Sequence, residues 1–159
     1  MKKIICFLLC GVILTGCVQY YLWFGTLFIM NCTDKTIHIV TNAESCEPNL
    51  SQGFVGTEFD IPPGDIAQIA ETKTFSDESM ITIEHFIDNY QDAYITVSLD
   101  SCGVFLSRTW TYADRHSRNK QFFNLNDSNF LRSIDSHFRY SLTYMRYTFK
   151  IYEEDLIEP

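Results

Sequence analysis

The chain has 159 residues, with 12 basic and 20 acidic side chains and a formal net charge of −8. This acidic balance excludes nucleic acid as a partner, and it excludes docking on anionic lipid through net charge. Aromatic residues make up 15% of the chain. Because aromatic side chains suit pleated, half-buried surfaces, their abundance favours β-structure.

The first 17 residues have the layout of a secretory signal peptide. Lys2 and Lys3 precede an apolar run over residues 4–14, and small residues follow it. The run ends in Leu14-Thr15-Gly16-Cys17, which resembles the lipobox of bacterial lipoproteins. The resemblance implies cleavage before Cys17, a diacylglyceryl group on its sulfur and a further acyl chain such as palmitate on its amine. Two or three acyl chains anchor a protein stably, whereas one holds only marginally.

We therefore divide the chain into a lipoprotein signal peptide (1–16), a tether with the start of the first strand (17–26), and a single β-rich domain (27–159). Without the signal peptide 143 residues remain, with 10 basic and 20 acidic side chains. That length is enough for one domain with its own core.

A signal-anchored membrane protein is the alternative. No charged residue occurs between Ile4 and Met30, and about 18 or more such residues can span a bilayer. An anchor has no reason to carry Leu-Thr-Gly-Cys at the cleavage position, so we favour the lipoprotein.

Turn residues and alternating apolar residues predict strands along the first half of the chain. Residues 28–41 predict a hairpin with its turn at 33–36. A polar loop follows over 42–53, and Pro62, Pro63 and Gly64 predict a turn before a short strand over 66–70. The segment 76–89 fits a helix capped by Ser76 and also fits an alternating strand, and we favour the helix.

The second half begins with the clearest alternation. Residues 93–99 predict a strand, 100–103 a turn and 104–112 the returning strand. Residues 113–120 and 127–136 are expected to be connections, the latter with one helical turn. In the last strand the apolar residues switch faces near Tyr144-Met145. A bulge there, or a strand that spans two environments, would explain the switch.

These elements predict a mainly β fold, an antiparallel β-sandwich of Ig-like character with one short helix. The chain also resembles the small uncharacterised lipoproteins of gut Bacteroidetes. The resemblance rests on the lipobox and on four short motifs at residues 31–39, 110–115, 120–124 and 147–156. It implies a β-rich extracytoplasmic domain and supplies no catalytic residues. In these lipoproteins surface export tends to need acidic residues behind the cysteine. Residues 18–21 contain none, so we expect an outer-membrane anchor that faces the periplasm.

No catalytic, metal or cofactor constellation stands out. The four histidines have no metal-binding spacing. Asp114, His116 and Ser117 are the residue types of a catalytic triad, but neighbours on one loop cannot readily take up its geometry. Glu153, Glu154 and Asp155 are expected to form a solvated tail. We therefore expect a non-enzymatic protein without a cofactor.

Tyr94, Trp110 and Tyr112 are candidate ligand-binding residues, because exposed aromatic clusters can mark binding sites and sugars stack on such rings. The alternative, which we favour, is that these rings cover a second sheet. Of the cysteines left after processing, Cys32 is expected to be a small buried residue, and Cys46 and Cys102 are expected to form a disulfide, since both lie in turn-rich segments.

These features together predict a lipid-anchored protein of the cell envelope that binds or assembles with a protein. A glycan-binding module is the second hypothesis. Under either hypothesis the protein is expected to contact the membrane through its lipid anchor.

Overall fold

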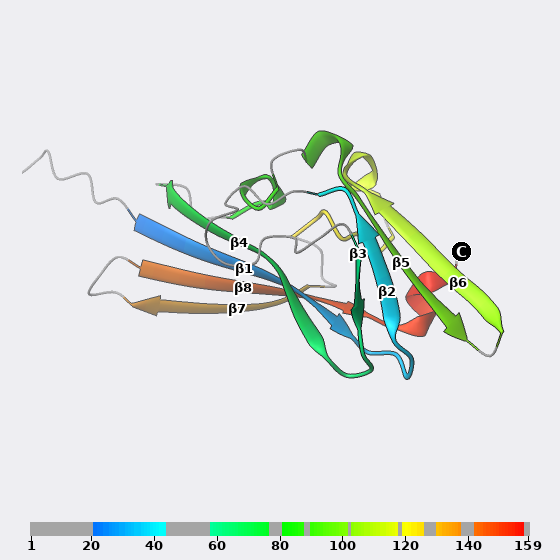
Figure 1. The fold of residues 1–159 in the computed structure, drawn as a ribbon. Helices are drawn as coiled ribbons and strands as arrows, with labels where there is room; N and C mark the ends of the chain where they lie inside the picture. The colour runs from blue at the N-terminus through cyan, green and yellow to red at the C-terminus, as the bar shows by residue number, and fades with distance from the viewer. Residues whose placement is uncertain are drawn as a thin grey trace, which may run out of the picture.

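The structure, a computed structural model, describes residues 21–43, 58–76, 81–87, 90–101, 103–117, 119–125, 130–137 and 142–157. The strands in these ranges are β1 (Tyr21–Asn31), β2 (Ile37–Thr41), β3 (Glu58–Ile61), β4 (Ile66–Ser76), β5 (Tyr94–Ser101), β6 (Val104–Thr111), β7 (Phe130–His137) and β8 (Leu142–Ile151). They form two four-stranded sheets (Figure 1). Sheet A has the order β4-β1-β8-β7, and sheet B has the order β3-β2-β5-β6.

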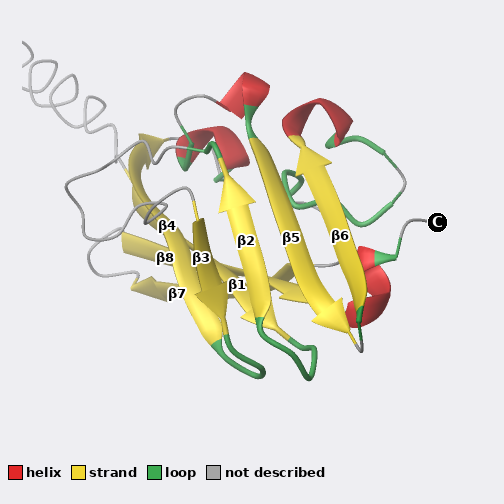
Figure 2. Ribbon diagram, turned by 45° about the vertical axis from the view of Figure 1, so that its right-hand side comes forward, coloured by secondary structure: helices red, strands yellow, loops and turns green. Residues whose placement is uncertain are grey.

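The predicted mainly β sandwich is confirmed. Figure 2 shows sheet B in front of sheet A, with short helical turns at the strand ends. Among the described strands every pairing is antiparallel except one: β1 runs parallel to β8, with Leu22 opposite Leu142 and Asn31 opposite Ile151. The first and last strands are therefore neighbours in the middle of sheet A.

The predicted hairpin over 28–41 is wrong. β1 belongs to sheet A and β2 to sheet B, so the turn over 32–36 carries the chain from one layer to the other. The turn over 62–65 does the same in reverse, from β3 to β4. It contains Gly64 at φ 75°, a conformation that glycine adopts without steric cost.

The side chain of Asn31 ties these two crossing turns together. It is fully buried, and its amide nitrogen donates to the Lys35 and Ile61 carbonyl oxygens at 2.7 and 2.8 Å. Its amide oxygen accepts from the backbone N–H and the hydroxyl of Thr33 at 2.9 and 2.8 Å. Its backbone carbonyl accepts from the Gly64 N–H. Both turns are therefore held by one amide with its polar atoms paired.

The hairpin predicted from residues 93–112 is confirmed. β5 pairs with β6 in an unbroken register from Tyr94–Thr111 to Ser101–Val104. Gly103, at φ 81°, lies in the connecting turn.

The helix predicted over 76–89 is wrong in the part that the structure describes. Ser76 is the last residue of β4 rather than a helix cap, and the described residues 81–87 hold a single 3₁₀ turn, η1 (Ile83–His85). Phe86 behind this turn packs against Gly25 of β1, where an added Cβ would lie 2.7 Å from the ring. Residues 81–87 thus cover the inner face of sheet A around Gly25.

In the last third of the chain one expectation is wrong, and of two alternatives for the last strand one is excluded. Residues 130–137 form the edge strand β7 rather than a helical connection. β8 keeps a constant register with both neighbours through Tyr144 and Met145, so it has no bulge there. The register shift of sheet A lies instead between Leu27 and Phe28, where β4 carries the extra residue Ile69. The alternative explanation for β8, two environments, is the one that fits.

The core lies between the two sheets. The Trp110 ring of sheet B meets the Phe149 ring of sheet A edge-on, with centroids 5.5 Å apart. Phe122, from the segment between β6 and β7, packs on Phe149 at 5.3 Å and closes the gap between the sheets. Most inward strand residues are apolar; they include Leu27, Ile29, Ile37, Ile39, Ile95, Val97, Leu99, Met145, Tyr147 and Ile151, while Asn31 and Thr41 are buried polar residues at strand ends.

Candidate functional site

The structure does not bring Tyr94, Trp110 and Tyr112 together on a surface. Trp110 faces the core and is 2% exposed, and Tyr112 is 8% exposed. Tyr94 is half-buried, and its position next to inward-facing Ile95 places it on the opposite face of sheet B. The hypothesis of an exposed aromatic cluster is therefore wrong, and the alternative, that the rings fill the core, holds for Trp110 and Tyr112.

The Trp110 ring system is packed by the protein itself and is almost fully buried. The Arg108 guanidinium lies over the ring, 5.2 Å from its centroid, and Phe149 meets it edge-on. The indole N–H donates to the Lys120 carbonyl oxygen at 2.7 Å. An indole packed in this way offers no free face on which a sugar ring can stack.

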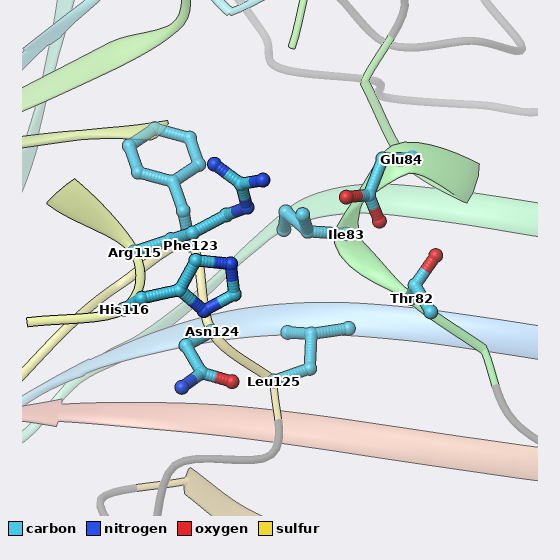
Figure 3. Close-up of a pocket in the computed structure, with 8 residues that line it drawn as sticks. All are labelled: Thr82, Ile83, Glu84, Arg115, His116, Phe123, Asn124 and Leu125. Carbon is cyan, nitrogen blue, oxygen red and sulfur yellow. The ribbon is translucent and has the colours of Figure 1, made fainter. Parts of the chain in front are cut away.

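Tyr112 instead contacts two residues, Glu84 and Arg115, that line a small cavity between two 3₁₀ turns. It starts η3 (Tyr112–Asp114), and its hydroxyl donates to the Glu84 carboxylate of η1. The Arg115 guanidinium lies over the Tyr112 ring, 3.9 Å from the centroid, and donates to the Tyr112 carbonyl oxygen at 3.1 Å. Figure 3 shows Glu84 and Arg115 reaching toward one another from opposite sides of the cavity.

The electrostatics of this group follow from burial and from the shared hydrogen bond. Burial, with help from the Glu84 carboxylate, raises the pKa of Tyr112 to about 12. Burial alone would raise the pKa of Glu84 as well. The hydrogen bonds that it accepts from Tyr112 and Thr82, together with the nearby Arg115, outweigh burial and hold that pKa below its ordinary value. Glu84 is therefore a carboxylate at neutral pH, and Tyr112 is a neutral donor.

The cavity itself is small. It has a volume of about 120 Å³ and is lined by Thr82, Ile83, Glu84, Arg115, His116, Phe123, Asn124 and Leu125. Pockets for organic ligands usually measure about 300–1,000 Å³. This one has room for water or a small ion, and its pairing of Glu84 with Tyr112 is a structural contact between η1 and η3.

A larger hollow lies along the open edge of β6. It has a volume of about 340 Å³, and its walls are mostly polar: Arg108, Thr109, Trp110, Asp114, Ser117, Asn119 and Gln121. The Gln121 amide nitrogen donates to the Ser117 hydroxyl at 2.6 Å, and the Lys120 carbonyl oxygen accepts from Trp110 of the strand. This hollow lies within the size range of ligand pockets.

The loop does not form a catalytic triad. The Asp114 carboxylate accepts from the Thr111 hydroxyl at 2.7 Å, and the Ser117 hydroxyl accepts from Gln121. In the part of the chain that the structure describes, neither side chain is hydrogen-bonded to His116. The same described residues contain no group of three His, Cys, Asp or Glu side chains that could hold a metal ion.

The expected solvated tail is wrong for Asp155. Residues Glu153–Leu156 form the 3₁₀ turn η5, in which Leu156 is buried and Asp155 pairs with Lys120. The two side chains are only 14% and 12% exposed. The Arg108 guanidinium of sheet B donates to the Asp155 carbonyl oxygen at 2.9 Å.

The feature that sequence reasoning missed lies on the outer face of sheet A, turned away from sheet B. Leu22 and Phe24 of β1 lie there beside Leu142 and Tyr144 of β8. The Phe24 and Tyr144 rings stack with centroids 5.1 Å apart and an interplanar angle of 13°. We call these four residues the outer patch. In the sequence this patch is indicated by the change of apolar face in the last strand, which either a bulge or a strand that spans two environments would explain.

Cys17, Cys46 and Cys102 lie outside the described residues, so their lipidation and pairing stay predictions. Cys32 carries a free thiol and is half-buried.

Comparison with known proteins adds no relative. The chain matches no family model, no curated protein and no solved structure. Among the described residues no helix has the length and apolar character needed to cross a membrane.

Proposed function

We propose that this protein is a lipid-anchored component of the cell envelope whose β-sandwich acts by binding, not by catalysis. The observation that carries the proposal is the spacing between the lipobox and the fold. Cys17 lies only four residues before Tyr21, where β1 begins. A signal peptide that is cleaved before Cys17 is removed without loss of any described residue.

The position of β1 also supports a lipoprotein over a signal anchor. Residues 21–30 are the last ten of the 27 residues in the charge-free stretch over 4–30. In the fold they pair with β4 on one side and with β8 on the other, so their backbone groups belong to a sheet. They are therefore not available to extend a membrane-spanning helix from residues 4–20.

The test is the Cys17→Ser variant. Lipidation precedes cleavage in a lipoprotein, so the variant should accumulate as an uncleaved precursor, while wild-type protein carries acyl chains on residue 17. Intact-mass spectrometry of membrane-extracted protein measures both. A wild-type protein that retains Met1, or a variant that is still cleaved before residue 17, would contradict the proposal.

We propose that the anchor faces the periplasm, because no acidic residue follows Cys17 in Val18–Tyr21. Protease added to intact cells should leave the protein whole, and it should cut the protein once the outer membrane is opened. Rapid digestion in intact cells would show surface display instead.

A glycan-binding module is the second candidate, and the hollow beside β6 is the observation that favours it. Asp114 and Asn119 in its wall offer the acceptors and donors that sugar hydroxyls use. Glycan arrays with wild type and with Asn119→Ala and Asp114→Ala variants test it. Specific binding that both substitutions weaken would support this function, and an array without specific binding would leave a protein ligand as the better candidate.

A further inference from the structure

β1 and β8 carry apolar side chains on both of their faces. Leu27 and Ile29 point into the core from β1, and Met145 and Tyr147 do so from β8. A strand with one face in water normally alternates between apolar and polar residues. The outer patch of Leu22, Phe24, Leu142 and Tyr144 breaks that alternation, so this face of sheet A has a role other than contact with water.

The four residues lie at one end of the sheet. β1 and β8 run parallel, so the beginnings of both strands meet, with Leu22 opposite Leu142 and Phe24 opposite Tyr144 (Figure 1). The Tyr144 side chain is 44% exposed although its ring stacks on Phe24. The patch is thus an accessible aromatic and aliphatic surface at the end of sheet A where β1 starts.

That end of the sheet is also the end nearest to the lipid anchor. Tyr21 follows Cys17 by four residues, which span at most about 14 Å when fully extended. A Cys17 that carries acyl chains in the bilayer therefore holds the patch beside the membrane surface. Aromatic rings such as Phe24 and Tyr144 are favoured at the boundary between headgroups and acyl chains.

The cationic side chains of this face suit the same depth. The Lys73 ammonium lies 5.8 Å from the centroid of the Phe24 ring, and the Arg146 guanidinium lies 4.1 Å from that of Phe28. Long basic side chains cover apolar surface with their stems while their charges stay in the polar headgroup layer.

We propose that the outer patch rests on the membrane into which Cys17 is anchored, with Phe24 and Tyr144 at the boundary between lipid headgroups and acyl chains. This inference rests on the proposed lipid anchor. The contact is driven by apolar area and by the tether rather than by net charge, because the processed chain carries 10 basic and 20 acidic side chains. A second copy of the chain and a protein partner are the other possible occupants of the patch, and the test separates them.

The experiment uses the lipidated full-length protein in phosphatidylcholine vesicles, with and without lipid brominated on its acyl chains. Phe24→Trp adds an indole in the patch, and Phe105→Trp adds one at a 73% exposed position of sheet B as the matched control. After subtraction of the wild-type emission, brominated lipid should quench most of the emission added by Phe24→Trp. It should leave the emission added by Phe105→Trp unchanged.

The outcomes separate the inference from the function on which it rests. Protein that fails to float with the vesicles contradicts the lipid anchor itself. Protein that floats while the added indole of Phe24→Trp stays unquenched overturns the proposed membrane contact alone. If that indole is shielded from acrylamide but not quenched by brominated lipid, a second copy or a protein covers the patch, and the proposal is wrong. A Tyr144→Asp substitution added to Phe24→Trp should reduce quenching while flotation is retained.

Discussion

Tyr112 and Glu84 share one hydrogen bond that couples two segments 28 residues apart in the chain. The contact holds the phenol in its neutral form, because the buried hydroxyl faces a carboxylate and cannot easily lose its proton. The unfolded chain has no such contact, so its tyrosines titrate near 10. The difference makes the stability of the fold depend on pH in the alkaline range.

Removing the hydroxyl with Tyr112→Phe tests this contact. The pKa of Tyr112 is higher in the folded state, at about 12, than in the unfolded state, so its stabilising effect is complete below pH 10 and is lost as the pH rises toward 12. Wild-type stability should therefore fall more steeply than that of Tyr112→Phe over this range. Urea denaturation at a series of pH values measures both slopes, and equal slopes would contradict the prediction. At neutral pH the variant should lose about 1 kcal/mol through the missing hydrogen bond.

At the level of the strands, the turns at 32–36 and 62–65 each connect one sheet to the other, so they determine in which sheet the flanking strands lie. Asn31 holds both turns through buried hydrogen bonds with the Lys35 and Ile61 carbonyl groups and with Thr33. Without its amide the Ile61 carbonyl group and the Thr33 N–H would lose these partners, whereas the Lys35 carbonyl would keep its hydrogen bond from the Thr33 hydroxyl. A buried polar group without a partner costs about 1–3 kcal/mol.

Asn31→Ala should therefore destabilise the fold by about 3 kcal/mol, since more than one buried group loses its partner. Asn119→Ala, at an exposed position of the loop beside β6, is the matched control and should change stability by about 0.5 kcal/mol or less. Chemical denaturation of the three proteins measures the effect. A loss for Asn31→Ala no larger than that of the control would show that the turns do not depend on this amide.

The same turns show what sequence patterns can and cannot predict. The β5–β6 hairpin was predictable because alternation and turn residues are local signals and the two strands are neighbours in one sheet. The turn at 32–36 has the same local signals, yet β1 and β2 lie in different layers. Local patterns do not distinguish a hairpin from a crossing between sheets, because that choice depends on pairing with β4, β5 and β8.

β7 and the outer patch were missed for opposite reasons. The side chains of residues 131–136 are all exposed and mix polar with apolar types. This edge strand therefore lacks the alternating pattern that marks a buried face in the sequence. In residues 142–151 the apolar side chains change from one face of the strand to the other. That pattern alone does not distinguish a bulge from a strand with apolar surroundings on both faces. The sequence draws attention to Trp110 but does not reveal its surroundings. Its ring contacts Phe149 of the other sheet, and it meets Arg108 and Lys120 only in the folded protein.

At the scale of the whole molecule, Lys120 and η5 fasten the two sheets to each other. The Lys120 ammonium donates to the Lys150 carbonyl oxygen of β8 and to the Asp155 carboxylate of η5. Arg108 of β6 reaches the same turn from sheet B through the Asp155 carbonyl oxygen. The open side of the sandwich is thereby closed by a largely buried ion pair.

Lys120→Met should destabilise the protein by about 3 kcal/mol, because it leaves the Asp155 carboxylate poorly solvated without its cation. A second substitution, Asp155→Asn, should restore part of that loss by removing the unpaired charge. Thermal and urea denaturation of the single and double variants measure the two effects. A double variant less stable than Lys120→Met would mean that the carboxylate matters through its hydrogen bond with the Tyr152 N–H rather than through the ion pair.

The parallel pairing of β1 with β8 sets the order in which the protein is able to fold. In the exported chain that we propose, β1 would be the first of the described strands to leave the translocation channel and β8 the last, separated from it by about 120 residues. Until β8 emerges, one edge of β1 has no partner, and such distant pairings form slowly. For a lipoprotein, sheet A would therefore be completed only after export of nearly the whole chain, when the N-terminus already lies at the membrane. Such a chain would mature on the bilayer surface, with the open edge of β1 exposed to the periplasmic chaperones until its last strand arrives.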